Sequence, residues 1–107
     1  MKVFEFDPFE TLLRVYLKMG GKKPLIVWDN VNTCEDNPKY GETIFCDDGD
    51  IQIRIDFNLK VLDAIEILAH ELSHALVGFE HGHDDVFEKT FDHIFDEYER
   101  IITETST

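Results

Sequence analysis

Apolar residues near the start of the chain recur every three or four positions. Over residues 8–19 the recurring positions are held by Phe9, Leu12, Leu13, Tyr16 and Leu17. This spacing is typical of a helix that buries one face. Asp7 stands where a side chain can cap the first turn, and Pro8 is well tolerated at the first helical position. The pair Gly20 and Gly21 predicts the end of this helix.

The next segments have the patterns of short strands. Residues 25–32 open with an apolar, β-favouring run, and residues 33–41 have the composition of a loop. Residues 43–46 and 51–57 flank the turn-forming cluster 47–50, which predicts a β-hairpin. In its second arm isoleucine and phenylalanine alternate with polar residues, so that arm is expected to bury one face.

After residue 58 the spacing becomes helical again. One apolar stripe contains Val61, Leu62, Ile65, Leu68, Ala69, Leu72, Ala75 and Leu76. This helix is expected to stop near Gly78. A last helix is expected to begin at Asp84 or Asp85, either of which can cap it, and to run to near Thr103, followed by a frayed polar tail.

One helix, three consecutive strands and two further helices predict an α+β domain with a small, mostly antiparallel three-stranded sheet. The chain has 107 residues, of which 43% are hydrophobic. That is enough for one modest core and too short for a separate binding domain. We therefore expect a single domain over residues 1–107.

The chain is strongly acidic, with 10 Lys and Arg against 23 Asp and Glu and a net charge of −13. Residues 47–107 contribute −12 of this charge, since they hold 16 acids and 4 bases. A field of this sign repels phosphate backbones. We therefore expect no direct nucleic-acid binding.

Cysteine spacing and hydropathy further restrict the class of protein that the sequence can encode. Cys34 and Cys46 lack the CxxC spacing of a thiolate zinc ribbon, and whether they pair is left open. No run approaches the apolar length of a membrane span, and residues 1–7 lack the pattern of a signal peptide. We expect a cytoplasmic protein that does not insert into membranes.

The helix over residues 61–77 carries the motif HExxH. His70 and His74 are four residues apart, on the side opposite the apolar stripe, where both imidazoles can reach one ion. Zinc lowers the pKa of its bound water to about 7, and a neighbouring carboxylate, here Glu71, can then accept the proton. These are the parts of a zinc-dependent peptide hydrolase.

A catalytic zinc takes three protein ligands and leaves one position open. The segment after the helix contains Gly78 and Gly82, which permit a sharp reversal of the chain. It offers four candidates for the third ligand, namely Glu80, His81, His83 and Asp84. The carboxylate of Asp84 or Asp85 could instead orient a ligand imidazole.

The motif and its sequel resemble the SprT-like branch of the zincin metallopeptidases. That family has HExxH, a short variable loop, and then Gly-His with an aromatic residue four positions later, which Gly82, His83 and Phe87 match. The resemblance covers about residues 60–95. It implies a zincin-like fold, His70, His74 and His83 as zinc ligands, and Glu71 as general base.

The chain departs from the family in several ways. The cysteine zinc ribbon and the basic DNA-binding segments of some members are absent, so their DNA-crosslinked substrates are not carried over. A metzincin pattern requires glycine at Val77, whereas glycine comes one residue later, and would make His81 the third ligand. A gluzincin pattern would use Glu88.

Zinc-dependent cleavage of a peptide or protein substrate is the predicted function. Zincins bind extended peptides at a strand edge, for which strand 51–57 is the candidate, with Arg54 facing the cleft. Tyr40 and Tyr98 are possible oxyanion donors that spacing does not place. The rival interpretation is a non-catalytic metal-binding interaction module on the same scaffold. The sequence does not indicate an oligomeric state.

Overall fold

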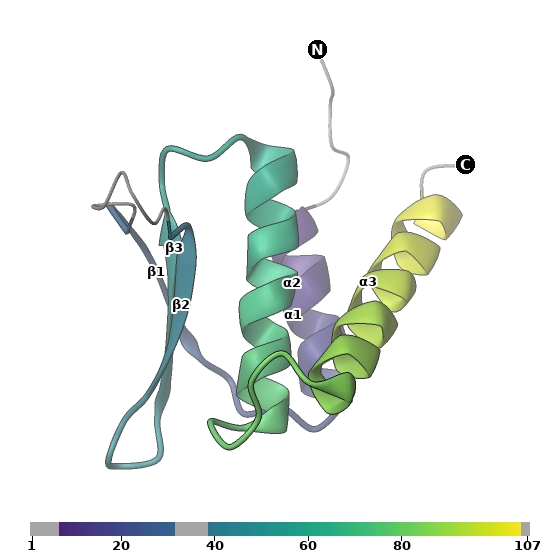
Figure 1. Cartoon of the computed structure of the whole chain (residues 1–107). Coiled ribbons are helices and arrows are strands. Elements are labelled where there is room, and N and C mark those ends of the chain that lie inside the picture. Colours follow the sequence, from purple (N-terminus) through teal and green to yellow (C-terminus); the bar gives the residue numbers. More distant parts are fainter. Residues whose placement is uncertain (1–6, 32–38, 106–107) are drawn as a thin grey trace.

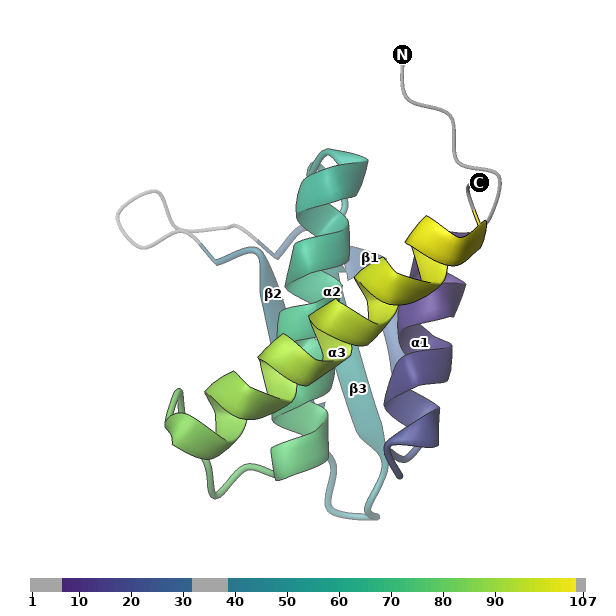
Figure 2. The same cartoon turned by 90° about the vertical axis from the view of Figure 1, so that its right-hand side faces the viewer.

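Three helices lie on one side of a three-stranded sheet (Figure 1). The computed structural model describes residues 7–31 and 39–105. Its elements are α1 (Pro8–Lys18), β1 (Leu25–Asp29), β2 (Gly41–Phe45), β3 (Ile51–Asp56), α2 (Val61–Val77) and α3 (Asp85–Thr105). Helices α1 and α2 form the layer nearest the sheet, and α3 runs obliquely across both (Figure 2). The α+β class predicted from the element order is confirmed.

The sheet is mixed and has the order β1-β3-β2. Strands β2 and β3 form the predicted antiparallel hairpin, but β1 pairs with β3 in parallel. The prediction of a mostly antiparallel sheet was therefore wrong in this detail. A hairpin turn fixes the pairing of the two strands it joins, whereas the partner of β1 is chosen by the tertiary fold. As a result β3 occupies the centre of the sheet and β2 is an edge strand.

The core lies between the sheet and the helices. Its side chains with no measurable exposure include Leu12, Tyr16, Ile53, Ile55, Leu68, Leu72 and Ile94. These come from the stripes and the alternating strand that the sequence pattern identified. In the first stripe Leu17 is 39% exposed. Three further positions in those patterns are exposed as well, at 59% for Phe57, 48% for Val61 and 56% for Leu62. They lie around the turn between β3 and α2, beyond the part of the helix that packs on the sheet.

Side-chain contacts stabilise the start of α1 and the end of α3. The Asp7 carboxylate accepts the backbone N–H of Phe9 at 3.0 Å, as predicted for a cap of α1. Helix α3 continues to Thr105, beyond the predicted end near Thr103. Arg100 pairs with Glu97 and Glu104 in the last turns, which supports this extension.

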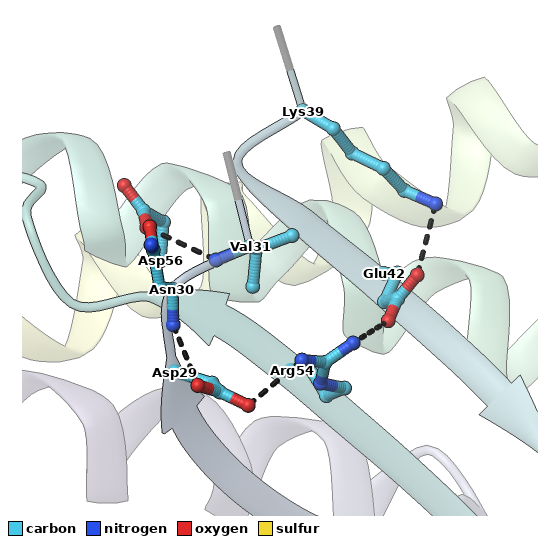
Figure 3. Close-up of polar contacts among 7 residues, drawn as sticks. All are labelled: Asp29, Asn30, Val31, Lys39, Glu42, Arg54 and Asp56. Atoms are coloured by element: carbon cyan, nitrogen blue, oxygen red, sulfur yellow. Dashed lines mark hydrogen bonds and ion pairs between the residues drawn. The ribbon is translucent and has the colours of Figure 1, made fainter. Parts of the chain in front are cut away.

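An ionic network crosses the face of the sheet that the helices leave uncovered (Figure 3). Arg54 on β3 pairs with Asp29 on β1, at 2.7 Å, and with Glu42 on β2. Glu42 also pairs with Lys39 at 3.0 Å. The buried Asp56 carboxylate accepts the backbone N–H of Val31 at 3.2 Å. Arg54 therefore joins the three strands, and the expectation that it faces the cleft was wrong because its neighbours Ile53 and Ile55 take the helix-facing side.

None of the helices that the structure describes is both long and apolar enough to cross a bilayer.

Candidate metal centre

Three imidazoles converge at the end of α2. His70 and His74 lie one helical turn apart on α2, and His83 reaches them from the loop that follows. Each pair of Nε2 atoms is separated by 3.2 Å. Two nitrogen ligands bound tetrahedrally to zinc at about 2.0–2.1 Å lie about 3.3–3.4 Å apart. The spacing of the three nitrogens therefore fits one small divalent ion.

The loop between α2 and α3 brings His83 back to the helix. Gly78 ends α2 with a φ of 92°, a left-handed conformation that side-chain-bearing residues rarely adopt, and its N–H donates to the His74 carbonyl at 3.0 Å. Asp84 closes the loop, because its carboxylate accepts the N–H of Phe87 at 2.9 Å and so caps α3. The second predicted hinge, Gly82, has no positive φ.

Phe87, in the first turn of α3, packs against all three imidazoles. Its ring centroid lies 4.9 Å from that of His70, 4.4 Å from that of His74 and 5.0 Å from that of His83. Only 5% of Phe87 is exposed. The aromatic residue that the family pattern has four positions after His83 thus forms one wall of the site.

Burial beside this apolar wall favours the neutral form of His70 and His74. Burial, reinforced by the neighbouring His74 and His83, lowers the pKa of His70 to about 4. Burial and the proximity of His83 also lower the pKa of His74. Nitrogen lone pairs that converge in a site unfavourable to protons repel one another unless a cation lies between them. The donor set suits zinc and several other first-row divalent ions, so it does not fix the identity of the metal.

Glu71 lies beside the imidazoles with its carboxylate buried. Its side chain is 6% exposed, and burial raises its pKa. The Thr43 hydroxyl on β2 donates a hydrogen bond to Glu71 Oε1 at 2.8 Å. This bond stabilises the charged carboxylate and so partly offsets the rise in pKa. A Cβ at Gly41 would lie 3.1 Å from Glu71 Oε2 and 2.6 Å from an Ile67 methyl. The carboxylate is therefore enclosed by the two β2 residues Gly41 and Thr43.

A cleft of about 430 Å³ opens between β2 and the second half of α2. Its lining includes His70, His74, His83 and Glu71. The three imidazoles and the carboxylate therefore face a common space that is open to a ligand.

The structure separates the candidates for the third ligand. His83 joins His70 and His74, whereas His81 and Glu88 are outside the potential metal-binding group found in the described residues. His81 also lines the cleft, but its Nδ1 lies 2.7 Å from Asp84 Oδ2. Asp84 thus both caps α3 and contacts His81, while Asp85 is the first residue of the helix.

The remaining candidates lie elsewhere. Tyr98 is buried in the core, and neither it nor Tyr40 lines the cleft. Cys46 is exposed, and its pairing with Cys34 involves a position outside the described residues. Sequence reasoning missed Thr43 and Gly41, since both are unremarkable strand residues until β2 is placed against α2.

Comparison with known proteins gives no relative for this chain. No protein-family model matches it, and no match was found among curated proteins or solved structures.

The histidine triad predicts one divalent metal ion per chain. His83→Ala should lower zinc affinity by more than about 100-fold, because even residues that only support ligands are worth 10- to 100-fold. His81→Ala, in the same loop, and His93→Ala, at an exposed position of α3, should change the affinity little. Calorimetric zinc titration of the four proteins measures this. Equal losses in His81→Ala and His83→Ala would contradict the assignment.

The contact between Thr43 and Glu71 predicts a measurable contribution to stability. Thr43→Val keeps the shape but removes the donor to a buried carboxylate, so the free energy of unfolding should fall by about 1–2 kcal/mol at neutral pH. Thr43→Ser keeps a hydroxyl donor and should therefore retain most of the wild-type free energy of unfolding. Urea unfolding of the metal-free proteins measures both, and a Val variant as stable as the Ser variant would show that the hydroxyl does not support Glu71.

The low pKa of His70 predicts a pH-dependent stability. The unfolded chain protonates this imidazole near pH 6.5 and the folded chain only near 4. The unfolded state therefore binds more protons in this window, and the contribution of His70 to stability declines as the pH falls through it. Glu71, with its raised pKa, acts in the opposite direction.

A His70→Gln variant isolates this contribution. Between about pH 7 and about pH 5, the metal-free variant should lose less unfolding free energy than the wild type. Urea unfolding in the presence of a chelator measures the two curves, and parallel curves would contradict a depressed pKa at His70.

Proposed function

We propose that this chain is a zinc-dependent metallopeptidase of the SprT-like, zincin type. The observation that carries the proposal is the buried carboxylate of Glu71 beside three convergent imidazoles, all lining one open cleft. The HExxH motif, Gly82-His83 and Phe87 match the SprT-like pattern, which supports the same assignment. A purely structural metal site has no need of a carboxylate in this place.

Each residue of the site has a role in the proposed reaction. His70, His74 and His83 would hold the metal through their Nε2 atoms, and Phe87 keeps water from the far side of the imidazoles. Bound zinc supplies an acidified water molecule and a Lewis acid for the carbonyl oxygen. Glu71 accepts the proton of the attacking water and returns it to the leaving amine.

The surroundings of Glu71 suit a group that accepts and then releases a proton. Burial raises its pKa, which makes the carboxylate a better base than an exposed one. Thr43 holds Oε1 at 2.8 Å from its hydroxyl, and Gly41 leaves room for the second oxygen. The strand thereby fixes the carboxylate in one position relative to the metal ligands.

The substrate would bind along β2. The predicted docking strand, β3, has both edges paired, so it offers no free edge. Asp56 N–H donates to the Tyr40 carbonyl and Cys46 N–H to the Asp50 carbonyl, each at 2.9 Å. Because hydrogen-bonded and non-hydrogen-bonded pairs alternate, the main chain of Gly41, Thr43 and Phe45 points away from β3. An extended peptide can add to this edge beside the cleft.

The net charge of −13 bears on which peptides would bind. Acidic segments would be repelled, so basic or neutral ones are the proposed substrates. A cytoplasmic location stays a prediction.

The Glu71→Gln variant tests the proposed chemistry. The amide is similar in size but cannot accept the proton, so kcat should fall by at least about 100-fold. Zinc binding should persist, because the three imidazoles are unchanged. A fluorogenic peptide library, assayed with zinc-loaded protein, measures the turnover.

Glu66→Gln is the matched control, since Glu66 is exposed on the same helix. Full activity of Glu71→Gln would refute the mechanism. A wild type that binds zinc yet cleaves no peptide would favour the rival function, a non-catalytic metal-binding interaction module.

A further inference from the structure

An aromatic pair, with one exposed and one half-buried ring, borders the cleft. Phe79 follows the end of α2 and is 77% exposed, more than any other large hydrophobic residue in the described part of the chain. Its ring contacts that of Phe45, at the end of β2, with a centroid separation of 5.8 Å. Both rings line the cleft that contains the three histidines. A single exposed apolar residue is ordinary, but an exposed ring that contacts a half-buried one beside a candidate metal site is a candidate for binding a ligand.

The aromatic pair occupies one end of the cleft. Strand β2 begins at Gly41, whose Cα faces Ile67 and Glu71 in the middle of α2, and ends at Phe45, beside Phe79 after the end of α2. The opposite end of the lining contains the ion pair of Lys39 and Glu42. The cleft is therefore charged at the start of β2 and aromatic at its end.

A peptide bound along the edge of β2 would run between the charged end and the aromatic end of the cleft. In an added strand, alternate side chains point to the same face of the sheet. The main chain of Phe45 points to the free edge, so such a peptide would run past it. One of its helix-facing side chains then lies against the two aromatic rings.

We propose that Phe45 and Phe79 form a subsite that binds an apolar side chain of an extended peptide, aromatic or branched aliphatic. The position of the peptide rests on the proposed function, whereas the chemistry of the subsite rests on the two rings. Contact with aromatic faces removes apolar surface from water, and polar or acidic side chains gain nothing there. This subsite would select substrates by one residue near the cleaved bond.

Binding to the zinc-loaded Glu71→Gln protein tests the subsite without cleavage. The probes are short fluorescein-labelled peptides of Gly, Ser and Lys that carry one Phe, Leu, Ala or Asp at successive positions. At one position we expect Phe and Leu to bind about tenfold more tightly than Ala, as measured by fluorescence anisotropy. Asp should bind more weakly than Ala.

Phe79→Ala, added to the same protein, should abolish the preference. The Kd of the Phe and Leu peptides should rise about tenfold, to that of the Ala peptide, which should itself hardly change. Because Phe79 is so exposed, its removal leaves the core intact. Phe57→Ala is the matched control, since Phe57 is 59% exposed and does not line the cleft.

The outcomes separate this inference from the proposed catalysis. An apolar preference that survives Phe79→Ala, or no binding of any probe, overturns the subsite. A preference that is lost in Phe79→Ala but not in Phe57→Ala supports it, even where the wild type cleaves no peptide and the catalytic proposal fails. Cleavage by the wild type without such a preference overturns the subsite and leaves the catalytic proposal standing.

Discussion

The reversal of the chain between α2 and α3 is the constraint on which the candidate site depends. A helix alone can direct His70 and His74 to one point, but it cannot supply a third imidazole to that point. The left-handed conformation of Gly78 turns the chain, and the Asp84 cap starts α3 at the place where Phe87 covers the imidazoles. Ligand geometry and helix packing are thus set by the same few residues.

The site also concentrates interactions that do not favour folding. Three imidazoles lie with their Nε2 atoms 3.2 Å apart, and a carboxylate with a raised pKa is buried beside them. Uncompensated, such groups destabilise a fold, which makes them informative about function. The core of the sheet and helices supports this arrangement, and the Thr43 hydroxyl compensates part of the burial of Glu71. A cation among the imidazoles would remove their mutual repulsion.

Sequence patterns predicted most of the fold because most of its elements are determined by residues close together in the sequence. The helical spacing identified α1, α2 and α3, and the turn cluster 47–50 identified the antiparallel hairpin of β2 and β3. The parallel pairing of β1 was missed, since no local pattern encodes which strand β1 pairs with or in which direction. The wrong choice of β3 as docking strand follows from the same gap, because an edge strand is defined only by the complete sheet.

The sequence likewise predicted only some of the residues of the candidate site. The helical positions of His70, Glu71 and His74 follow from the motif, and the family pattern pointed to His83. The contacts of Thr43 and Gly41 with Glu71, and that of Phe45 with Phe79, form where β2 meets α2 and the loop after it. These segments are far apart in the sequence, so no local pattern predicts the contacts.

The central proposal is that a bound metal ion has three imidazole ligands and one open position. X-ray absorption of the zinc-loaded protein tests it most directly. We expect three imidazole nitrogens and one water oxygen at about 2.0–2.1 Å from the zinc ion. A closed site with four protein ligands, or a protein that takes up no zinc, would contradict it.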